Sequence, residues 1–478
     1  MSTFVTVIFL RIMNLKNKIG IRWVVLLCLA LPMFASYFFD DIFSTVSHLF
    51  QTPELLELNW NMGDYGHYKS AYSLLCVFGG LVFCGILLDK WGVRVTGSVF
   101  VGMMLVGAAL IRYAVSGSFA WGGVNVWLSQ FFPKPSVTVA YLGCALFGLG
   151  SEIAGVAVNR SISKWFKGRE IALAMGIQLA LARLGTATAM LLIPRIVNVS
   201  QTPIPFAETA RGAMIGLTLI VAGVIVWGVF VALDSAFDRR GTKIAPEADA
   251  SSKPSGGDSS RDEFRLRDVL KVLGNKNFLL IALLCVTFYC CIVSFRKFAS
   301  AIVIPRFGVD AAVASVMVSM IPFCTLVFAP LFGAMVDRMG HGTRVMVFGA
   351  CMVAVAHLIL AFAPSVAVFG YLGIVLLGLG YSLVPAAMWP SVPKLVPEKV
   401  LGTAFSLLYW IQNMGLMAVP LLVGGIMERN SGQPFAAAGK AELLFIGISA
   451  LAILTSLAIA LQSKRHPELG LDEKCRTL

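Results

Sequence analysis

The sequence predicts an all-α membrane protein with twelve transmembrane helices in two pseudo-symmetric six-helix bundles. Three observations lead to this prediction: the composition, twelve apolar stretches of spanning length, and two pairs of internal repeats. Of the 478 residues, 58% are hydrophobic and only 13% are charged. Because a soluble domain carries about 25% charged residues, this chain needs lipid to cover its apolar surface.

Each apolar stretch is long enough to cross a hydrocarbon core of about 30 Å, which takes ~20 helical residues. The stretches lie near 22–46, 66–88, 95–116, 138–164, 169–196, 211–234, 277–303, 311–336, 343–363, 366–393, 400–427 and 441–462. The net charge of +13 does not indicate a nucleic-acid partner, because the basic residues cluster in the short connections between spans, where they set the membrane orientation. Those connections fall on one side, so the positive-inside rule makes that side and both termini cytoplasmic.

The longest polar stretch divides the chain into two halves. We predict an N-terminal bundle at 1–234, a cytoplasmic linker at 235–276, a C-terminal bundle at 277–462 and a cytoplasmic tail at 463–478. Ser260 and Glu263 have the spacing of a capping box and precede apolar residues. The linker is therefore predicted to end in a short interfacial helix on the cytoplasmic face.

Two sequence repeats relate the halves. "GILLDKWGVR" begins at Gly85 after span 2, and "GAMVDRMGHG" begins at Gly333 after span 8. "YLGCALFGLG" at 141–150 matches "YLGIVLLGLG" at 371–380 in seven of ten positions. Since each half has six spans, the halves share one membrane orientation. Parallel repeats with a site between them at mid-membrane are a transporter architecture.

The duplicated G-x-x-x-D-[K/R]-x-G pattern resembles the loop signature of the major facilitator superfamily. The resemblance implies gating roles for residues at the cytoplasmic ends of spans 2 and 8, with an acid that latches the outward-open state. Mapped onto this sequence, they are Gly85, Asp89, Lys90, Gly92 and Arg94 in the first copy, and Asp337 and Arg338 in the second. The second copy departs from the pattern, because His341 and Gly342 replace the expected basic pair.

Two ionisable residues lie far inside predicted spans. Glu152 in span 4 and Arg183 in span 5 are both roughly 20 Å from the same short loop at 1.5 Å per residue. Ions at this depth usually face a cavity or a partner. One interpretation is a structural Glu152–Arg183 salt bridge. The other is a zwitterion site, with an ammonium on Glu152 and a carboxylate on Arg183. The second is favoured because the repeat places uncharged Ser382 and Asn413 at the equivalent positions.

The surrounding sequence resembles the lysosomal dipeptide transporter branch of the superfamily and its bacterial relatives. The segments that carry the resemblance are "FGLGSEIAGVAVNRSISKWFKGREIALAMGIQLALARLG" and "LGLGYSLVPAAMWPSVPKLVPEKVLGTAFSLLYWIQNMGL". It implies that Glu152 and Arg183 clasp the two ends of a dipeptide. Further substrate contacts are expected within the matching segments from Asn159, Gln178, Tyr381, Trp389, Gln412 and Asn413. For these, helix–helix hydrogen bonds and packing are the structural alternative.

An alternative function is the transport of organic anions, such as sugar phosphates, by Arg183 together with Arg296 or Lys297 of span 7. Those two residues have a second interpretation, in which they snorkel to the outer surface. Asp40 and Asp41, near the outer end of span 1, either gather cations at the outer mouth or are solvated, and solvation is favoured. His357 in span 9 is expected to be a packed histidine on a lipid-facing scaffold helix.

The sequence contains no nucleotide-binding loop, catalytic-triad spacing or metal-ligand set. We therefore expect neither an enzyme nor a cofactor, and the expected partners are the lipid bilayer and a small zwitterion, with no nucleic acid. The eukaryotic branch that the chain resembles works with a luminal glycoprotein, and an accessory subunit is left open. A cell (inner) membrane location is favoured over a lysosomal one because no acidic dileucine signal is visible in the termini.

Overall fold

The computed structural model describes residues 18–166, 171–198, 202–244, 272–397 and 400–473. These residues are almost entirely helical, and their β pairing is limited to an isolated bridge between Leu56 and Ile204. Within these described ranges, eleven helices are long and apolar enough to cross a membrane. The remaining predicted span, span 2, is a helix broken into segments that are each too short to cross a membrane alone. The prediction of twelve spans in an all-α membrane fold is therefore confirmed.

The spans follow one another in each half with short connections. In the N-terminal half they are α2 (Lys18–Asp40), α3 (Met62–Ser70) with the first part of α4 (Leu81–Ala114), the rest of α4, α7 (Pro135–Trp165), α8 (Ile171–Ile196) and α10 (Arg211–Ile244). In the C-terminal half they are α12 (Lys276–Tyr289) with α13 (Phe295–Phe307), α14 (Ala311–Met339), α15 (Gly342–Phe362), α16 (Ala367–Leu395), α17 (Leu401–Glu428) and α18 (Pro434–Arg465). The short helices α5 (Gly117–Ala120) and α6 (Gly123–Leu128) lie between α4 and α7.

The second span is interrupted, where the sequence predicted a continuous helix over 66–88. A π turn at Cys76–Gly80 breaks it, and Gly79 has a φ of 95°, which glycine adopts without steric cost. The break frees backbone carbonyls from the helix ladder. One of them, Val77 O, accepts a hydrogen bond of 2.7 Å from Trp410 Nε1 of α17. The break is therefore stabilised by the opposite half of the molecule.

The linker begins differently from the prediction. α10 continues to Ile244, so the first ten residues of the predicted linker extend the helix of span 6. The predicted interfacial helix around Ser260 and Glu263 lies outside the described residues, which resume at 272.

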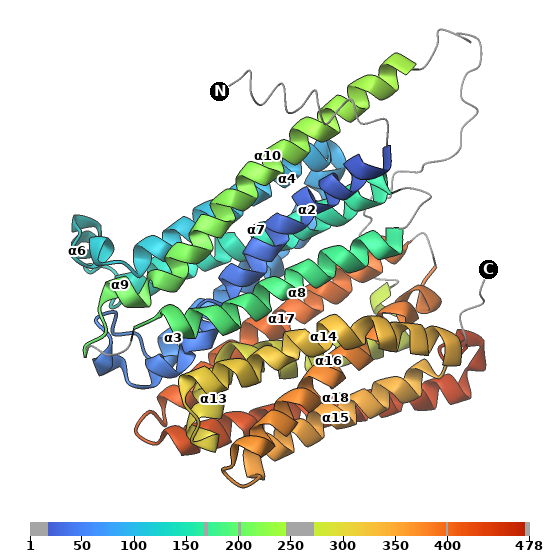
Figure 1. Cartoon of the computed structure of the whole chain (residues 1–478). Coiled ribbons are helices and arrows are strands. Elements are labelled where there is room, and N and C mark those ends of the chain that lie inside the picture. Colours follow the sequence, from blue (N-terminus) through green and yellow to red (C-terminus); the bar gives the residue numbers. More distant parts are fainter. Residues whose placement is uncertain (1–17, 167–170, 199–201, 245–271, 398–399, 474–478) are drawn as a thin grey trace.

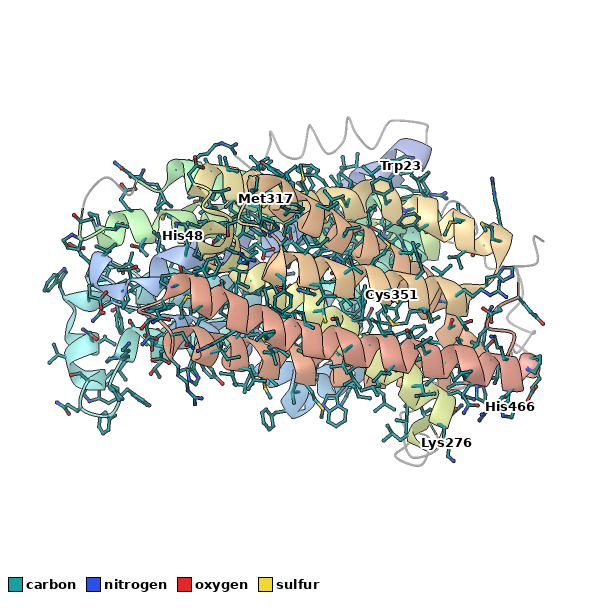
Figure 2. All side chains as sticks on the ribbon, turned by 90° about the horizontal axis from the view of Figure 1, so that it is seen from below. Trp23, His48, Lys276, Met317, Cys351 and His466 are labelled. Carbon is teal, nitrogen blue, oxygen red and sulfur yellow. The ribbon has the colours of Figure 1, made fainter. Side chains whose placement is uncertain are left out.

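The two halves converge at one end of the bundle and diverge at the other (Figure 1). We name these ends by the predicted topology: α2 begins and α18 finishes at the cytoplasmic end, and α3 and α13 lie at the outer end. Figure 2 shows His48 and Met317 toward the outer end, and Lys276 and His466 at the cytoplasmic end. Across the halves, α3 packs on α17, α8 on α14, and α13 on the short helix η1 (Ser44–Gln51). The molecule is therefore closed at its outer end.

Two glycines allow the closest approach between the halves. A Cβ atom at Gly424 of α17 would lie 2.7 Å from Met62 O and 2.9 Å from Gly66 Cα, both on α3. A Cβ atom at Gly66 would lie 2.7 Å from Pro420 O. Because these neighbours are backbone atoms, a side chain at either glycine cannot be accommodated without separating α3 from α17.

Candidate functional site

Glu152 lies at the middle of α7, where its carboxylate accepts a hydrogen bond from the second span. Tyr72 OH is 3.2 Å from Glu152 Oε1 and 3.2 Å from Ser151 Oγ. The hydroxyls of Ser151 and Ser36 are 2.6 Å apart, which ties α7 to α2 at this level. Among the described residues, Glu152 is thus held by the neutral hydroxyl group of Tyr72 rather than by a cation.

Arg183 lies on α8 and reaches the interface between the halves. Its guanidinium carbon is 5.5 Å from the ring centroid of Tyr37 on α2 and 5.1 Å from that of Tyr381 on α16. Tyr37 belongs to the N-terminal half and Tyr381 to the C-terminal half. Aromatic faces attract a guanidinium but do not neutralise it. Arg183 Nε is buried and has no hydrogen-bond partner among the described residues.

In the described part of the chain, Glu152 and Arg183 form no ion pair with each other or with another charged side chain. The structural salt bridge considered from the sequence is therefore not made in this conformation. Leaving a charge unpaired in the middle of a membrane protein is costly. Two opposite and unpaired charges, each midway along its helix, are the chemistry that a zwitterionic ligand would complete.

Of the other predicted site residues, the structure brings Tyr381 into contact with Arg183. Asn159 is exposed on the same face of α7 as Glu152, two turns closer to the cytoplasmic end. Gln178 is buried on α8, about 140° around the helix from Arg183. Gln412 Oε1 accepts a hydrogen bond of 3.5 Å from Cys285 Sγ, and Asn413 Nδ2 donates a hydrogen bond of 3.0 Å to Tyr409 O. Both amides therefore make contacts within the C-terminal half, and their roles in binding stay predictions.

Trp389, the remaining predicted site residue, belongs to an aromatic cluster. Its Nε1 donates a hydrogen bond of 3.0 Å to Tyr289 OH. Its ring lies 5.2 Å from the ring of Tyr409 and 6.0 Å from that of Phe405. Tyr289 in turn contacts Tyr381 edge to face at 5.9 Å. The cluster extends from Arg183 along α12, α16 and α17, so this part of the C-terminal half is aromatic rather than charged.

Five charged residues form a second site, which we name the outer ion cluster: Asp40 and Asp41 of span 1, Lys69 of span 2, and Arg296 and Lys297 of span 7. Lys297 pairs with Asp40, and Arg296 Nη2 lies 3.3 Å from Asp41 Oδ2. Lys69 Nζ lies 3.5 Å from Asp40 Oδ1. These contacts join the two halves, because the acids belong to the N-terminal half and Arg296 and Lys297 to the C-terminal half.

The expected environments of these residues were wrong. Asp41 is fully buried rather than solvated, and Arg296 and Lys297 are only 4% and 6% exposed rather than snorkelling. In this conformation their charges are directed at carboxylates rather than at an anionic ligand. Lys69 is the sequence signal that could have indicated this cluster, because it is a cation inside an apolar span. It was not recognised from the sequence.

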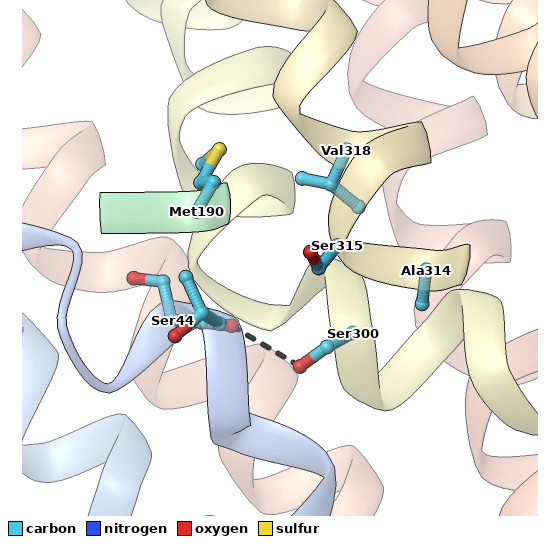
Figure 3. Close-up of a pocket in the computed structure, with 7 residues that line it drawn as sticks. Ser44, Met190, Ser300, Ala314, Ser315 and Val318 are labelled. Atoms are coloured by element: carbon cyan, nitrogen blue, oxygen red, sulfur yellow. Dashed lines mark hydrogen bonds between the residues drawn. The ribbon is translucent and has the colours of Figure 1, made fainter. Parts of the chain in front are cut away.

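Further hydrogen bonds complete the closure around the outer ion cluster. The hydroxyls of Ser47 and Ser300 are 2.8 Å apart, Gln51 Nε2 donates to Ala301 O, and Asn61 Nδ2 donates to Glu428 Oε1. Figure 3 shows Ser300 donating to Ser44 O beside a pocket of about 10 Å³. Residues from both halves line this pocket, namely Ser44, Thr45, Met190, Ser300, Ala314, Ser315 and Val318. The space left between the halves at this pocket is therefore small.

The predicted gating residues of the first repeat hold one half together at its cytoplasmic end. Gly92 has a φ of 74° and makes the turn between spans 2 and 3 inside α4. Arg94 Nε donates to Asp234 Oδ2 over 2.6 Å, and Lys164 Nζ lies 2.9 Å from Asp234 Oδ1. Arg94 therefore links α4 and α10 within the N-terminal half.

The predicted latch between the halves stays a prediction. Lys90 is exposed, whereas the surroundings of Gly85 and the side chain of Asp89 lie outside the described part of the structure. In the second repeat, Asp337 and Arg338 lie at the cytoplasmic end of α14. The tail packs nearby instead, where Asp472 Oδ1 accepts from Thr343 N over 2.9 Å at the start of α15.

His357 is packed, as predicted, but it faces a partner rather than lipid. Its Nδ1 lies 2.8 Å from Glu442 Oε2 of α18, and both side chains are fully buried. The ring stacks on Phe445 at 5.2 Å. Sequence reasoning missed Glu442, although it lies inside the predicted twelfth span.

We expect His357→Leu to lower stability strongly, because it leaves the Glu442 carboxylate buried without its partner. Breaking a buried pair costs about 3–5 kcal/mol. The double variant His357→Leu/Glu442→Met removes both polar groups, and we expect it to recover most of the loss. Thermal unfolding of the detergent-purified variants measures both effects. Equal melting temperatures for wild type and His357→Leu would show that the pair is not a stabilising contact.

A family model described as Major Facilitator Superfamily matches residues 29–304 and 291–474. Among curated proteins, the chain is similar to the "Lysosomal dipeptide transporter MFSD1" of Homo sapiens, with 26% identity over 94% of this chain and 88% of that protein. The protein of the same name from Bos taurus is 28% identical over 94% of this chain and 87% of its own length. The Gallus gallus protein is 30% identical over 60% of this chain and 62% of its own length.

Solved structures share the fold at low sequence identity. The nucleoside transporter NupG has a TM-score of 0.63 at 14% identity, covering 91% of this chain and 99% of that one. A bacterial homologue of the human lysosomal transporter Spinster, in an inward-facing and occupied conformation, has a TM-score of 0.63 at 13% identity, covering 93% and 97%. The inward-open xylose transporter XylE from E. coli has a TM-score of 0.64 at 13% identity, covering 93% and 96%.

Proposed function

The chain belongs to the Major Facilitator Superfamily, whose members are membrane transporters rather than enzymes, and from this premise we propose that it carries dipeptides across the membrane by alternating access. The observation that carries the proposal is the pair of opposite charges midway along α7 and α8, Glu152 and Arg183, which make no ion pair among the described residues. The relatives named as dipeptide transporters, at 26–30% identity, support the same substrate class.

In the proposed complex, the peptide's ammonium group donates to Glu152 and its carboxylate accepts from Arg183. Each charge-assisted hydrogen bond contributes roughly 1.5–3 kcal/mol. Arg183 suits the carboxylate because its guanidinium is already positioned between Tyr37 and Tyr381. Binding would therefore neutralise both half-buried charges at once and draw on contacts from both halves.

From the outer closure we infer that this conformation is inward-facing. The cross-half ion pairs and hydrogen bonds of the described residues all lie between the outer end and the middle of the bundle. Toward the cytoplasmic end the halves diverge (Figure 1). To reach an outward-facing state, the protein must separate the outer ion cluster and the α3–α17 contact. The outer ion cluster is thus the proposed outer gate.

The organic-anion alternative is not favoured. It requires Arg296 or Lys297 to offer a free positive charge beside Arg183. Both side chains instead pair with Asp40 and Asp41 in this conformation. The relatives' names also point to dipeptides rather than to organic anions.

The membrane in which this multi-pass protein works is part of the proposal. Both termini are placed on the cytoplasmic side by the basic residues of the short connections. The curated relatives are named as lysosomal, so a lysosomal location stands beside the cell (inner) membrane location that the sequence favoured.

Uptake by purified protein in liposomes tests the proposed substrate. We expect saturable accumulation of a labelled dipeptide that excess unlabelled dipeptide abolishes, and no accumulation of a labelled sugar phosphate. Protein-free liposomes and liposomes with Glu152→Gln protein are the controls. Robust uptake of the sugar phosphate with no uptake of any dipeptide would overturn the proposal.

A further inference from the structure

Tyr72 lies where the candidate substrate site meets the outer ion cluster. Its hydroxyl donates toward Glu152 Oε1 over 3.2 Å, and Lys297 Nζ lies 5.6 Å from its ring centroid. Lys297 in turn pairs with Asp40. A single phenol side chain therefore contacts both the proposed ammonium-binding acid and a cation that closes the outer end.

The surroundings of Tyr72 fix its position. Its backbone lies directly on α7, since a Cβ atom at Gly148 would come within 2.0 Å of Tyr72 O. Gly148 is one helical turn from Glu152. The ring also lies 6.2 Å from that of Phe147, with an edge-to-face tilt of 61°. The backbone of Tyr72 cannot move closer to α7. When the hydroxyl changes its hydrogen-bond partner, the ring must therefore shift, and its contact with Lys297 changes with it.

We propose that Tyr72 is a positioning residue that couples occupancy of Glu152 to opening of the outer ion cluster, an inference that rests on the proposed role of Glu152 in substrate binding. Without substrate, the Glu152 carboxylate holds the phenol and attracts Lys297 across it. A substrate ammonium neutralises Glu152 and competes for the oxygen that accepts from Tyr72, because charge-assisted hydrogen bonds are the stronger ones. Lys297 then loses part of its stabilisation, so the outer ion cluster loosens.

The sign of the effect follows from the charges. Neutralising Glu152, by an ammonium or by Glu152→Gln, favours the open outer end, and Tyr72 is required for most of that shift. Coupling between two sites is reciprocal and typically changes an equilibrium 5- to 150-fold. A purely structural Tyr72 would alter stability in every state and would leave the response to Glu152 unchanged.

Distances across the outer end provide the test. Noncanonical residues that carry spin labels replace Ser118 on α5 and exposed Ser431 in the α17–α18 connection. Double electron–electron resonance then gives the populations of molecules with an open and with a closed outer end. Without ligand, we expect the single variant Glu152→Gln to have an open-to-closed ratio at least about 5-fold higher than that of wild type. In the Tyr72→Phe background, which keeps the ring over Lys297, we expect the same substitution to change the ratio less than about twofold.

Tyr68→Phe is the matched control, because Tyr68 is a buried tyrosine one turn away that makes no contact with Glu152 among the described residues. It should retain the full response to Glu152→Gln. An undiminished response in Tyr72→Phe would overturn the proposal. If Tyr72→Phe does not fold, an unchanged population in Glu152→Gln alone also overturns it.

A second arm adds dialanine to wild type and to Tyr72→Phe, with binding followed separately by ligand-dependent melting. We expect both proteins to bind and only wild type to open. Binding without opening in wild type contradicts the coupling, whereas absence of binding contradicts the proposed function and leaves the ligand-free comparison to decide on Tyr72.

Discussion

Replacing Glu152 with glutamine is expected to lower dipeptide affinity about 10- to 150-fold while ligand-free thermal stability holds or rises. The loss corresponds to one charge-assisted hydrogen bond of roughly 1.5–3 kcal/mol. Stability holds because the only group bonded to the carboxylate among the described residues is the neutral hydroxyl of Tyr72, and the amide removes a costly buried charge. Melting curves with and without dipeptide measure both quantities.

Glu442→Gln is the matched control for this change. It is the same substitution at an acid that is fully buried, whereas Glu152 is half-buried, and Glu442 pairs with His357 rather than with a residue of the candidate site. We expect it to lower stability and to leave dipeptide affinity within about twofold, since distant sites behave additively. A loss of stability in Glu152→Gln that matched the loss in Glu442→Gln would indicate a structural role for Glu152.

The other large effect is expected at the outer end. Gly424→Leu should prevent α17 from closing on α3, because even a Cβ atom at this position would lie 2.9 Å from Gly66 Cα. Overpacking of this kind costs typically 1–3 kcal/mol, which corresponds to a shift of roughly 5- to 150-fold toward the outward-open state. We expect dipeptide uptake to fall by at least about tenfold, with the protein still folded.

The neighbouring glycine offers the control. A Cβ atom at Gly425 would have no neighbour within 4 Å, so Gly425→Leu should transport like wild type. Distances between spin labels at positions 118 and 431 report the outer end directly. Gly424→Leu protein that still populates the closed distance as wild type does would contradict the role given to the α3–α17 contact.

The fold was predictable because its signals are local and repeated. Apolar length marks a span wherever it occurs, and the repeats at Gly85/Gly333 and Tyr141/Tyr371 relate the two halves without any knowledge of packing. The break in span 2 was not predictable in the same way. It is stabilised by Trp410, which lies more than three hundred residues further along the chain and donates to Val77 O.

The candidate site was predictable only where a charge interrupts an apolar span. Glu152 and Arg183 are conspicuous for that reason, and Tyr381 was found through the repeat and the resemblance. Tyr37 and Tyr72 were missed because a tyrosine within an apolar stretch carries no such signal. Only the fold shows that they contact the two charges.

The outer ion cluster shows a different limit. Asp40, Asp41, Arg296 and Lys297 were each recognised as unusual, yet they were considered separately, as solvated acids and as snorkelling or ligand-binding bases. Their pairing depends on the closed arrangement of η1, which follows α2, against α13, because this contact brings the two pairs together across the halves. Sequence position alone does not indicate that contact, because the pairs lie in different halves.

Calorimetric binding of end-blocked peptides tests most directly whether Glu152 and Arg183 clasp the two ends of a dipeptide. Dialanine, N-acetyl-dialanine and dialanine amide are titrated into wild type, Glu152→Gln and Arg183→Gln. In wild type, we expect each block to cost about 10- to 150-fold in affinity. Acetylation should cost little more in Glu152→Gln, and amidation little more in Arg183→Gln, because the partner of the blocked group is already gone. Equal penalties for both blocks in all three proteins, or recovery of dialanine binding in the double variant Glu152→Gln/Arg183→Gln, would contradict the clasp.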